Sequence, residues 1–249
     1  MLKSKLLAAL IHITLSLVIF ITFFGLLIFF WFPEPYFTAS GGWQGLKIVA
    51  FIDIILGPLL TFIVFNKHKP KTELKTDLGI ILVLQLSALI WGINTVYKQR
   101  PIAFTFWEDS FYTVTYNAIT KHYSAQQIEM LTKNPRAFYF VKKPNSLEAI
   151  KQLNKTITTK NIPPFLIIER YLSLSEHFDK IKIHTIDIHE VMSINKEMKA
   201  DLLQQLKDQQ SKVEDNYYLP LISKYHNIIL IFSKSGELIG SIKAPLKVL

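Results

Sequence analysis

Long uncharged apolar runs fill the first hundred residues of the chain, whereas the rest shows the shorter, mixed patterns of a globular domain. The first run, 6–32, has 27 residues without a charge. As a helix it would be about 40 Å long, which exceeds the ~30 Å hydrocarbon core of a bilayer. A signal-peptide core has only about 7–15 apolar residues. We therefore expect three uncleaved transmembrane helices, over 6–32, 48–65 and 78–97, in a membrane domain spanning 1–100.

Loop charges orient these three helices. The loop between the first two carries only Glu34 as a charged residue, and the aromatic residues Trp31, Trp43 and Trp91 fall near its side of the membrane. Because cytoplasmic loops are rich in lysine and arginine, the lysine-bearing segments should lie inside the cell and everything after the third helix outside. Those lysines are Lys3, Lys5, Lys67, Lys69, Lys71 and Lys75.

Residues 101–249 are numerous enough to bury a core of their own and predict an α+β domain outside the cytoplasm. Pairs of short strand-like runs flank a polar turn near each end of this region, so each pair predicts a β-hairpin. Helices are expected where a capping residue precedes an apolar stripe. The expected strands are 102–106, 111–116, 137–141, 217–222, 227–232 and 237–242, with Pro220 favouring an edge position. The expected helices are 124–131, 146–153, 167–174 and one that Asn195 caps, with an apolar stripe of Met198, Leu202, Leu203 and Leu206.

Polar residues inside the predicted spans are the main candidates for function. A central aspartate in a transmembrane helix costs about 2.5–3.5 kcal/mol, so Asp53 should face protein and have a partner. It belongs either to a binding or proton-transfer site or to a polar clamp that fixes helix packing. Residue counts along the helices place Thr22 and Asn94 at the depth of Asp53, and His12, Thr61 and Gln85 in a second, inner layer.

Two breaks in the apolar pattern suggest special backbone geometry. Pro58 has no N–H for the carbonyl of Ile54, so we expect a kink in the second span. The outer loop is rich in proline, glycine and aromatic residues, which predicts a stiff exit, a tight return and rings lying at the membrane surface, with a partner surface as the alternative. Its candidate interface residues are Trp31, Pro33, Pro35, Tyr36, Gly41, Gly42 and Gln44.

Charge and motif content exclude several function classes. The net charge of +9 divides into +5 before residue 101 and +4 after it, without a basic cluster, so nucleic-acid binding is not expected. The chain has no cysteine and none of the common nucleophile, phosphate-loop or zinc motifs, so we expect no catalytic residues, cofactor or metal. His184–Glu190 is expected to be an exposed strand whose histidines point to opposite faces, a poor zinc geometry. Glu108 and Asp109 are expected to contact solvent at a turn.

Three stretches resemble one known family. They are Trp31–Phe37 with Gly41–Gly45, then Asp53–Thr61, and then Asp77–Arg100 with Pro101, within about residues 1–116. In these stretches the chain is similar to the type IV pilin accessory proteins of the TfpX/TfpZ kind. The family's Asp-Arg-Phe triplet is Asp109-Ser110-Phe111 here, with serine in place of arginine. The residues that match the family after the third helix join the candidate interface residues; they are Arg100, Pro101, Asp109 and Phe111.

The resemblance implies a non-enzymatic, chaperone-like accessory factor that supports type IV pilin stability or pilus assembly. It implies the bacterial inner membrane, with the N-terminus cytoplasmic and the C-terminal domain, 101–249, periplasmic. The expected partners are type IV pilin, the lipid bilayer and other pilus assembly proteins. Two alternatives stay open: a membrane-embedded enzyme or a ligand-binding membrane protein that uses the polar layer of Asp53 and Asn94.

Overall fold

The computed structural model describes residues 2–32, 36–40, 42–132, 137–223 and 226–244. The chain divides into two compact units, one of Met1–Phe37 with Gly41–Lys98 and one of Thr38–Ser40 with Gln99–Leu249. The first unit is helical and the second combines a sheet with helices, so the predicted fold class, three membrane helices followed by an α+β domain, is confirmed.

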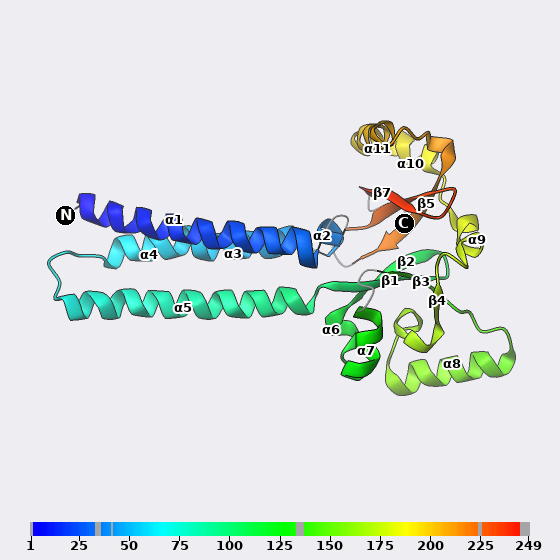
Figure 1. The fold of residues 1–249 in the computed structure, drawn as a ribbon, viewed down its shortest axis with the longest axis horizontal. Coiled ribbons are helices and arrows are strands. Elements are labelled where there is room, and N and C mark those ends of the chain that lie inside the picture. The colour runs from blue at the N-terminus through cyan, green and yellow to red at the C-terminus, as the bar shows by residue number, and fades with distance from the viewer. Residues whose placement is uncertain (1, 33–35, 41, 133–136, 224–225, 245–249) are drawn as a thin grey trace. The chain divides into compact units, whose positions relative to one another are not determined.

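The first unit consists of three long helical rods (Figure 1). Each is long and apolar enough to cross a bilayer, over Leu2–Trp31, Gly45–Val64 and Lys71–Lys98. Most of their apolar side chains face outward, as lipid-facing residues do. The elements are α1 (Leu2–Leu26), η1 (Leu27–Trp31), α2 (Tyr36–Ala39), α3 (Gly42–Ala50), η2 (Phe51–Leu56), α4 (Gly57–Val64) and α5 (Lys71–Lys98).

The second rod changes its hydrogen-bond pattern just before Pro58. Residues Phe51–Leu56 are π-helical, and the N–H of Gly57 bonds to the carbonyl of Ile52, five residues back. Because Pro58 has no N–H to donate, the ladder before it shifts register. The disruption expected at Pro58 therefore takes the form of a π-helical segment, which contains Asp53.

Aromatic side chains close one end of the membrane unit. Phe37 is almost fully buried and its ring lies edge-on to Trp43, while Trp31 lies 5.0 Å from the ring of Tyr97. Gly42 is required there because a Cβ at this position would overlap the ring of Phe37. The rings of the predicted outer loop thus pack on one another and on rings of α1 and α5, and Trp43 keeps half of its surface exposed.

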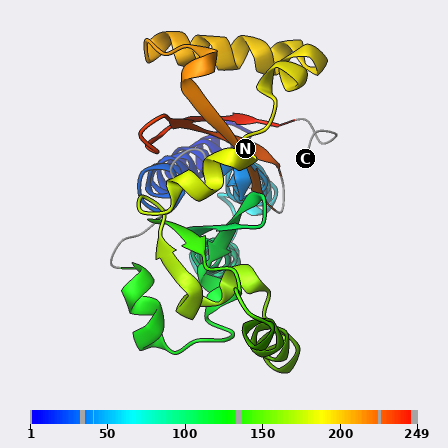
Figure 2. The same cartoon turned by 90° about the vertical axis from the view of Figure 1, so that its right-hand side faces the viewer.

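The second unit is built on one seven-stranded mixed sheet, in the order β4-β3-β1-β2-β5-β6-β7 (Figure 2). The pairs β1–β3 and β2–β5 are parallel and the others antiparallel. Both predicted hairpins, β1–β2 and β6–β7, are present. The strands are β1 (Pro101–Trp107), β2 (Ser110–Thr115), β3 (Ala137–Val141), β4 (Tyr171–Ser173), β5 (Asn216–Ile222), β6 (Ile228–Ser233) and β7 (Leu238–Lys243).

Helices cover different ends of this sheet, with α10 and α11 beside β5–β7 and α8 toward the opposite end (Figures 1 and 2). Buried residues of α10 and α11 form one core cluster with β5–β7, and α7 and α8 contribute to another with β1 and β2. The helices are α6 (Tyr116–Ile119), α7 (Ala125–Thr132), α8 (Leu147–Lys160), α9 (Phe178–Ile181), α10 (Ile188–Ile194) and α11 (Lys196–Asp208). Short 3₁₀ turns are η3 (Pro164–Leu166), η4 (Ile168–Arg170), η5 (Lys182–His184) and η6 (Val213–Asp215).

Two predicted elements are wrong. The helix expected over 167–174 is a 3₁₀ turn followed by β4, because Tyr171–Ser173 pair with the edge of β3. The strand expected over 184–190 is instead η5 and the start of α10. Asp187 caps α10, since its Oδ1 accepts hydrogen bonds from the N–H groups of His189 and Glu190 at 2.9 and 3.3 Å.

Pro220 lies inside the sheet and not at its edge. The backbone N–H of Tyr218 donates to Oγ1 of Thr185 and its C=O accepts from the N–H of Ile186, so both groups point away from β6. The backbone of Pro220, two residues further along the strand, points to the same side. The pairing of β5 with β2 begins only at Leu221, so the missing N–H of Pro220 interrupts no ladder. In α11, Met198, Leu202 and Leu206 are buried as expected, whereas Leu203 is exposed.

Candidate functional site in the membrane helices

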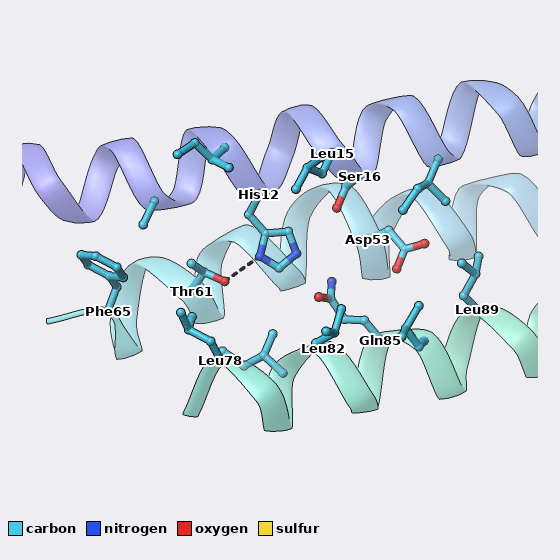
Figure 3. Close-up of a pocket in the computed structure, with 15 residues that line it drawn as sticks. His12, Leu15, Ser16, Asp53, Thr61, Phe65, Leu78, Leu82, Gln85 and Leu89 are labelled. Carbon is cyan, nitrogen blue, oxygen red and sulfur yellow. Dashed lines mark hydrogen bonds between the residues drawn. The ribbon is translucent and has the colours of Figure 1, made fainter. Parts of the chain in front are cut away.

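A cavity of about 460 Å³ lies within the membrane unit. Side chains from α1, from the η2–α4 rod and from α5 line it, and His12, Ser16, Asp53 and Gln85 point into the same space (Figure 3). On α1 the lining positions recur at the helical spacing of three and four residues, which puts them on one face. The remaining lining residues are Ala8, Ile11, Leu15, Ile19, Thr61, Phe65, Leu78, Ile81, Leu82, Leu86 and Leu89.

His12 connects the first and second rods. Its Nδ1 shares a hydrogen bond of 2.6 Å with Oγ1 of Thr61, a short contact between two half-buried or buried groups. A polar bond between helices holds them in register inside a bilayer, where water cannot compete for it. The structure thus brings His12 and Thr61, two residues of the predicted inner layer, into contact.

Gln85 joins this layer from α5 because Gly57 makes room for it. A Cβ at position 57 would overlap the Gln85 amide and would lie 3.0 Å from Nε2 of His12. The absence of a side chain on Gly57 thus lets two polar side chains from two other helices reach the backbone of α4. The sequence pattern marked Gly57 only as a neighbour of Pro58, so its role was missed.

Asp53 carries the one carboxylate among the residues that line this cavity. Its side chain has only 7 % exposure, yet no hydrogen bond or ion pair reaches its carboxylate from the part of the chain that the structure describes. The carboxylate faces the cavity together with Ser16 and Gln85 (Figure 3). A buried polar group without a partner is costly in a membrane, where such residues mark sites of function.

Thr22 and Asn94 do not join Asp53. Both are exposed, neither lines the cavity, and the hydroxyl of Thr22 donates to the carbonyl of Val18 in its own helix. Residue counts matched Thr22 and Asn94 to Asp53 by depth without regard to helical phase. At 100° per residue, Thr22 points about 80° away from His12, and Asn94 points opposite to Gln85. His12, at a different estimated depth, occupies the cavity with Asp53 instead.

The candidate interface residues of the first loop differ in burial and contacts. Tyr36 is buried, Trp31 is half-buried and Gly42 contacts Phe37. Pro33, Pro35 and Gly41 lie outside the described residues, as does the side chain of Gln44.

The candidates after the third helix belong to the start of the sheet. Arg100 places its guanidinium 4.0 Å from the centre of the Tyr116 ring, and Pro101 begins β1. Ser110 donates to the carboxylate of Asp109 at 2.9 Å, and Phe111 is fully buried among other phenylalanines of the sheet. Phe111 is thus a core residue.

The possible metal ligands among the described residues are dispersed. No group of three His, Cys, Asp or Glu side chains gathers there in a way that could hold a metal ion. His184, expected on a strand, ends a 3₁₀ turn and its ring lies 5.5 Å from that of Phe106.

Comparison with known proteins gives the family. Residues 1–41 match the family Fimbrial assembly protein FimB. Over 219 residues, 86% of this chain and 84% of the relative, the chain is 29% identical to the fimbrial assembly protein of serogroup E1 of Dichelobacter nodosus. Identity to its serogroup I counterpart is 28% over 222 residues, covering 86% and 84% of the two chains. No solved structure matches.

A third relative has the higher identity. The fimbrial assembly protein of serogroups C1 and C2 of Dichelobacter nodosus is 40% identical over 100 residues, which is 40% of this chain and 76% of that protein. On the strength of this similarity, the chain belongs to the family of fimbrial assembly proteins that includes FimB.

Proposed function

We propose that this chain is a non-enzymatic accessory factor of the bacterial inner membrane, of the TfpX/TfpZ kind, that supports type IV pilin stability or pilus assembly. Membership of the fimbrial assembly family carries the proposal. The relatives are named for assembly, and the chain resembles pilin accessory proteins over its whole membrane unit. The expected partners are pilin, the lipid bilayer and other proteins of the assembly apparatus.

The proposed orientation follows from charge. The lysines lie in the first turn of α1, in the loop between α4 and α5 and in the first turns of α5. These ends of the helices therefore face the cytoplasm and the sheet domain faces the periplasm. A fimbrial subunit awaiting assembly would then meet the membrane helices with its membrane-embedded part and the sheet domain with its exported part.

A clean gene deletion tests the proposal, with surface pili and total cell pilin quantified side by side. We expect surface pili to fall and complementation to restore them. Retained total pilin would indicate a role in assembly, and lost pilin a role in subunit stability. Unchanged pili and unchanged pilin would contradict the proposal.

A further inference from the structure

The cavity in the membrane unit is the inner part of a groove between α1 and α5. Both helices pack against the rod that contains α4, while α1 and α5 make little direct contact with each other. The lining runs from Ala8 to Ile19 on α1 and from Leu78 to Leu89 on α5. Each stretch is about 16 Å long, or three helical turns.

The walls and the floor of this groove differ in character. Leu15 and Leu82, one on each wall, expose 61% and 56% of their surfaces. Polar groups lie at the floor, where Asp53 is buried and receives no hydrogen bond from the described residues. Lipid chains could cover the apolar walls, but they offer nothing to a carboxylate.

The depth of Asp53 restricts what can satisfy it. Within the span Gly45–Val64 it lies about 12 Å from one end and about 16 Å from the other. Lipid headgroups stay at the interfaces, so a donor that this chain does not itself supply is carried to this depth by another protein segment. Only a helix satisfies its own backbone there while presenting a side chain sideways.

We propose that the groove between α1 and α5 binds one transmembrane helix of a partner protein, which places a hydrogen-bond-donating side chain against Asp53. The partner packs apolar side chains on the Leu15 and Leu82 walls over about three turns. Asp53 then selects for the donor, since a partner without one leaves the carboxylate unsatisfied. This inference deepens the proposed function, on which it rests for the expectation that the natural partner is a fimbrial subunit.

Synthetic helices test the selectivity directly. The full chain, which has no native cysteine, is labelled at a single Thr72→Cys site and reconstituted into phosphatidylcholine vesicles. Acceptor-labelled Leu/Ala transmembrane peptides with either Asn or Leu at the centre are added, and energy transfer reports binding. From the usual strength of hydrogen bonds between membrane helices, the Asn peptide should bind about 3- to 30-fold more tightly.

Three variants make the test specific. Asp53→Leu should reduce the preference for Asn below about twofold. Leu82→Trp, which blocks the groove from the α5 wall, should weaken the binding of both peptides. Asn94→Leu, an exposed polar residue outside the groove, should leave the preference unchanged. Equal binding of both peptides to the unmodified chain, an unchanged preference in Asp53→Leu, or displacement of the peptide by unlabelled copies of the chain would overturn the proposal.

The outcome is separable from that of the gene deletion. If deletion abolishes pili but the peptides do not discriminate, the accessory role stands and the groove proposal fails. If the peptides discriminate but deletion changes neither pili nor pilin, the groove proposal stands and the pilin role fails.

Discussion

Gly236, in the turn between β6 and β7, should tolerate no side chain. Its φ of +84° lies in the left-handed region, where a residue with a Cβ costs roughly 1–2 kcal/mol. A Cβ would also lie 2.9 Å from Cγ of Phe178, and that ring is buried against Tyr217 and Phe232 and cannot withdraw freely. Overpacking of this kind costs about 1–3 kcal/mol. Gly236→Ala should therefore destabilise the sheet domain by about 2–5 kcal/mol.

Gly240→Ala, four residues further along the same hairpin, is the matched control. A Cβ there meets Oε1 of Gln205, the far end of a flexible side chain that can move. We expect a change of no more than about 1 kcal/mol. The assay is urea unfolding of the detergent-solubilised full chain, with brief proteolysis reporting the intact sheet domain. Equal stability of the two variants, or a Gly236→Ala protein as stable as the unmodified chain, would refute the reasoning.

Two further predictions concern the same domain. Burial raises the pKa of Tyr218 to about 12, so the folded state keeps this proton after the unfolded state has lost it near pH 10. The contribution of Tyr218 to the free energy of unfolding should be fully present below pH 10 and fall by up to about 1.4 kcal/mol per pH unit between pH 10 and 12. In alkaline unfolding curves, Tyr218→Phe should make the loss of stability over this range shallower. Asn195 accepts a hydrogen bond of 3.0 Å from the N–H of Met198 at the start of α11. Asn195→Ala should cost about 1 kcal/mol in urea unfolding and Asn195→Asp almost nothing, whereas equal losses would contradict a capping role.

Periodicity and turn chemistry carried much of the fold prediction. The uncharged runs are long enough that only membrane helices explain them, and both hairpins have turn residues at their predicted positions. The errors lie where tertiary contacts or caps override pattern. Residues Tyr171–Ser173 form a strand because they pair with β3, and this pairing cannot be predicted from the local sequence. Asp187, followed three residues later by Glu190, was a capping signal that an apparent alternation of polar residues concealed.

The candidate site could be predicted only in part, because it too depends on tertiary contacts. Residue counts gave the depth of each polar group, but a site also needs the groups to face one another. His12, Thr61 and Gln85 face the same cavity, whereas Thr22 and Asn94 do not line it. The π-helical segment that holds Asp53 and the space left by Gly57 depend on how three helices pack, which one sequence does not reveal.

We propose that the polar groove in the membrane unit serves fimbrial assembly. The most direct measurement is the amount of surface pili in a deletion strain complemented with Asp53→Leu, alongside Thr22→Leu, with the level of each variant in the membrane matched by immunoblot. Both substitutions remove a polar group from a membrane helix, but only Asp53 faces the groove. We expect that Thr22→Leu restores surface pili and Asp53→Leu does not. Full restoration by Asp53→Leu would contradict it.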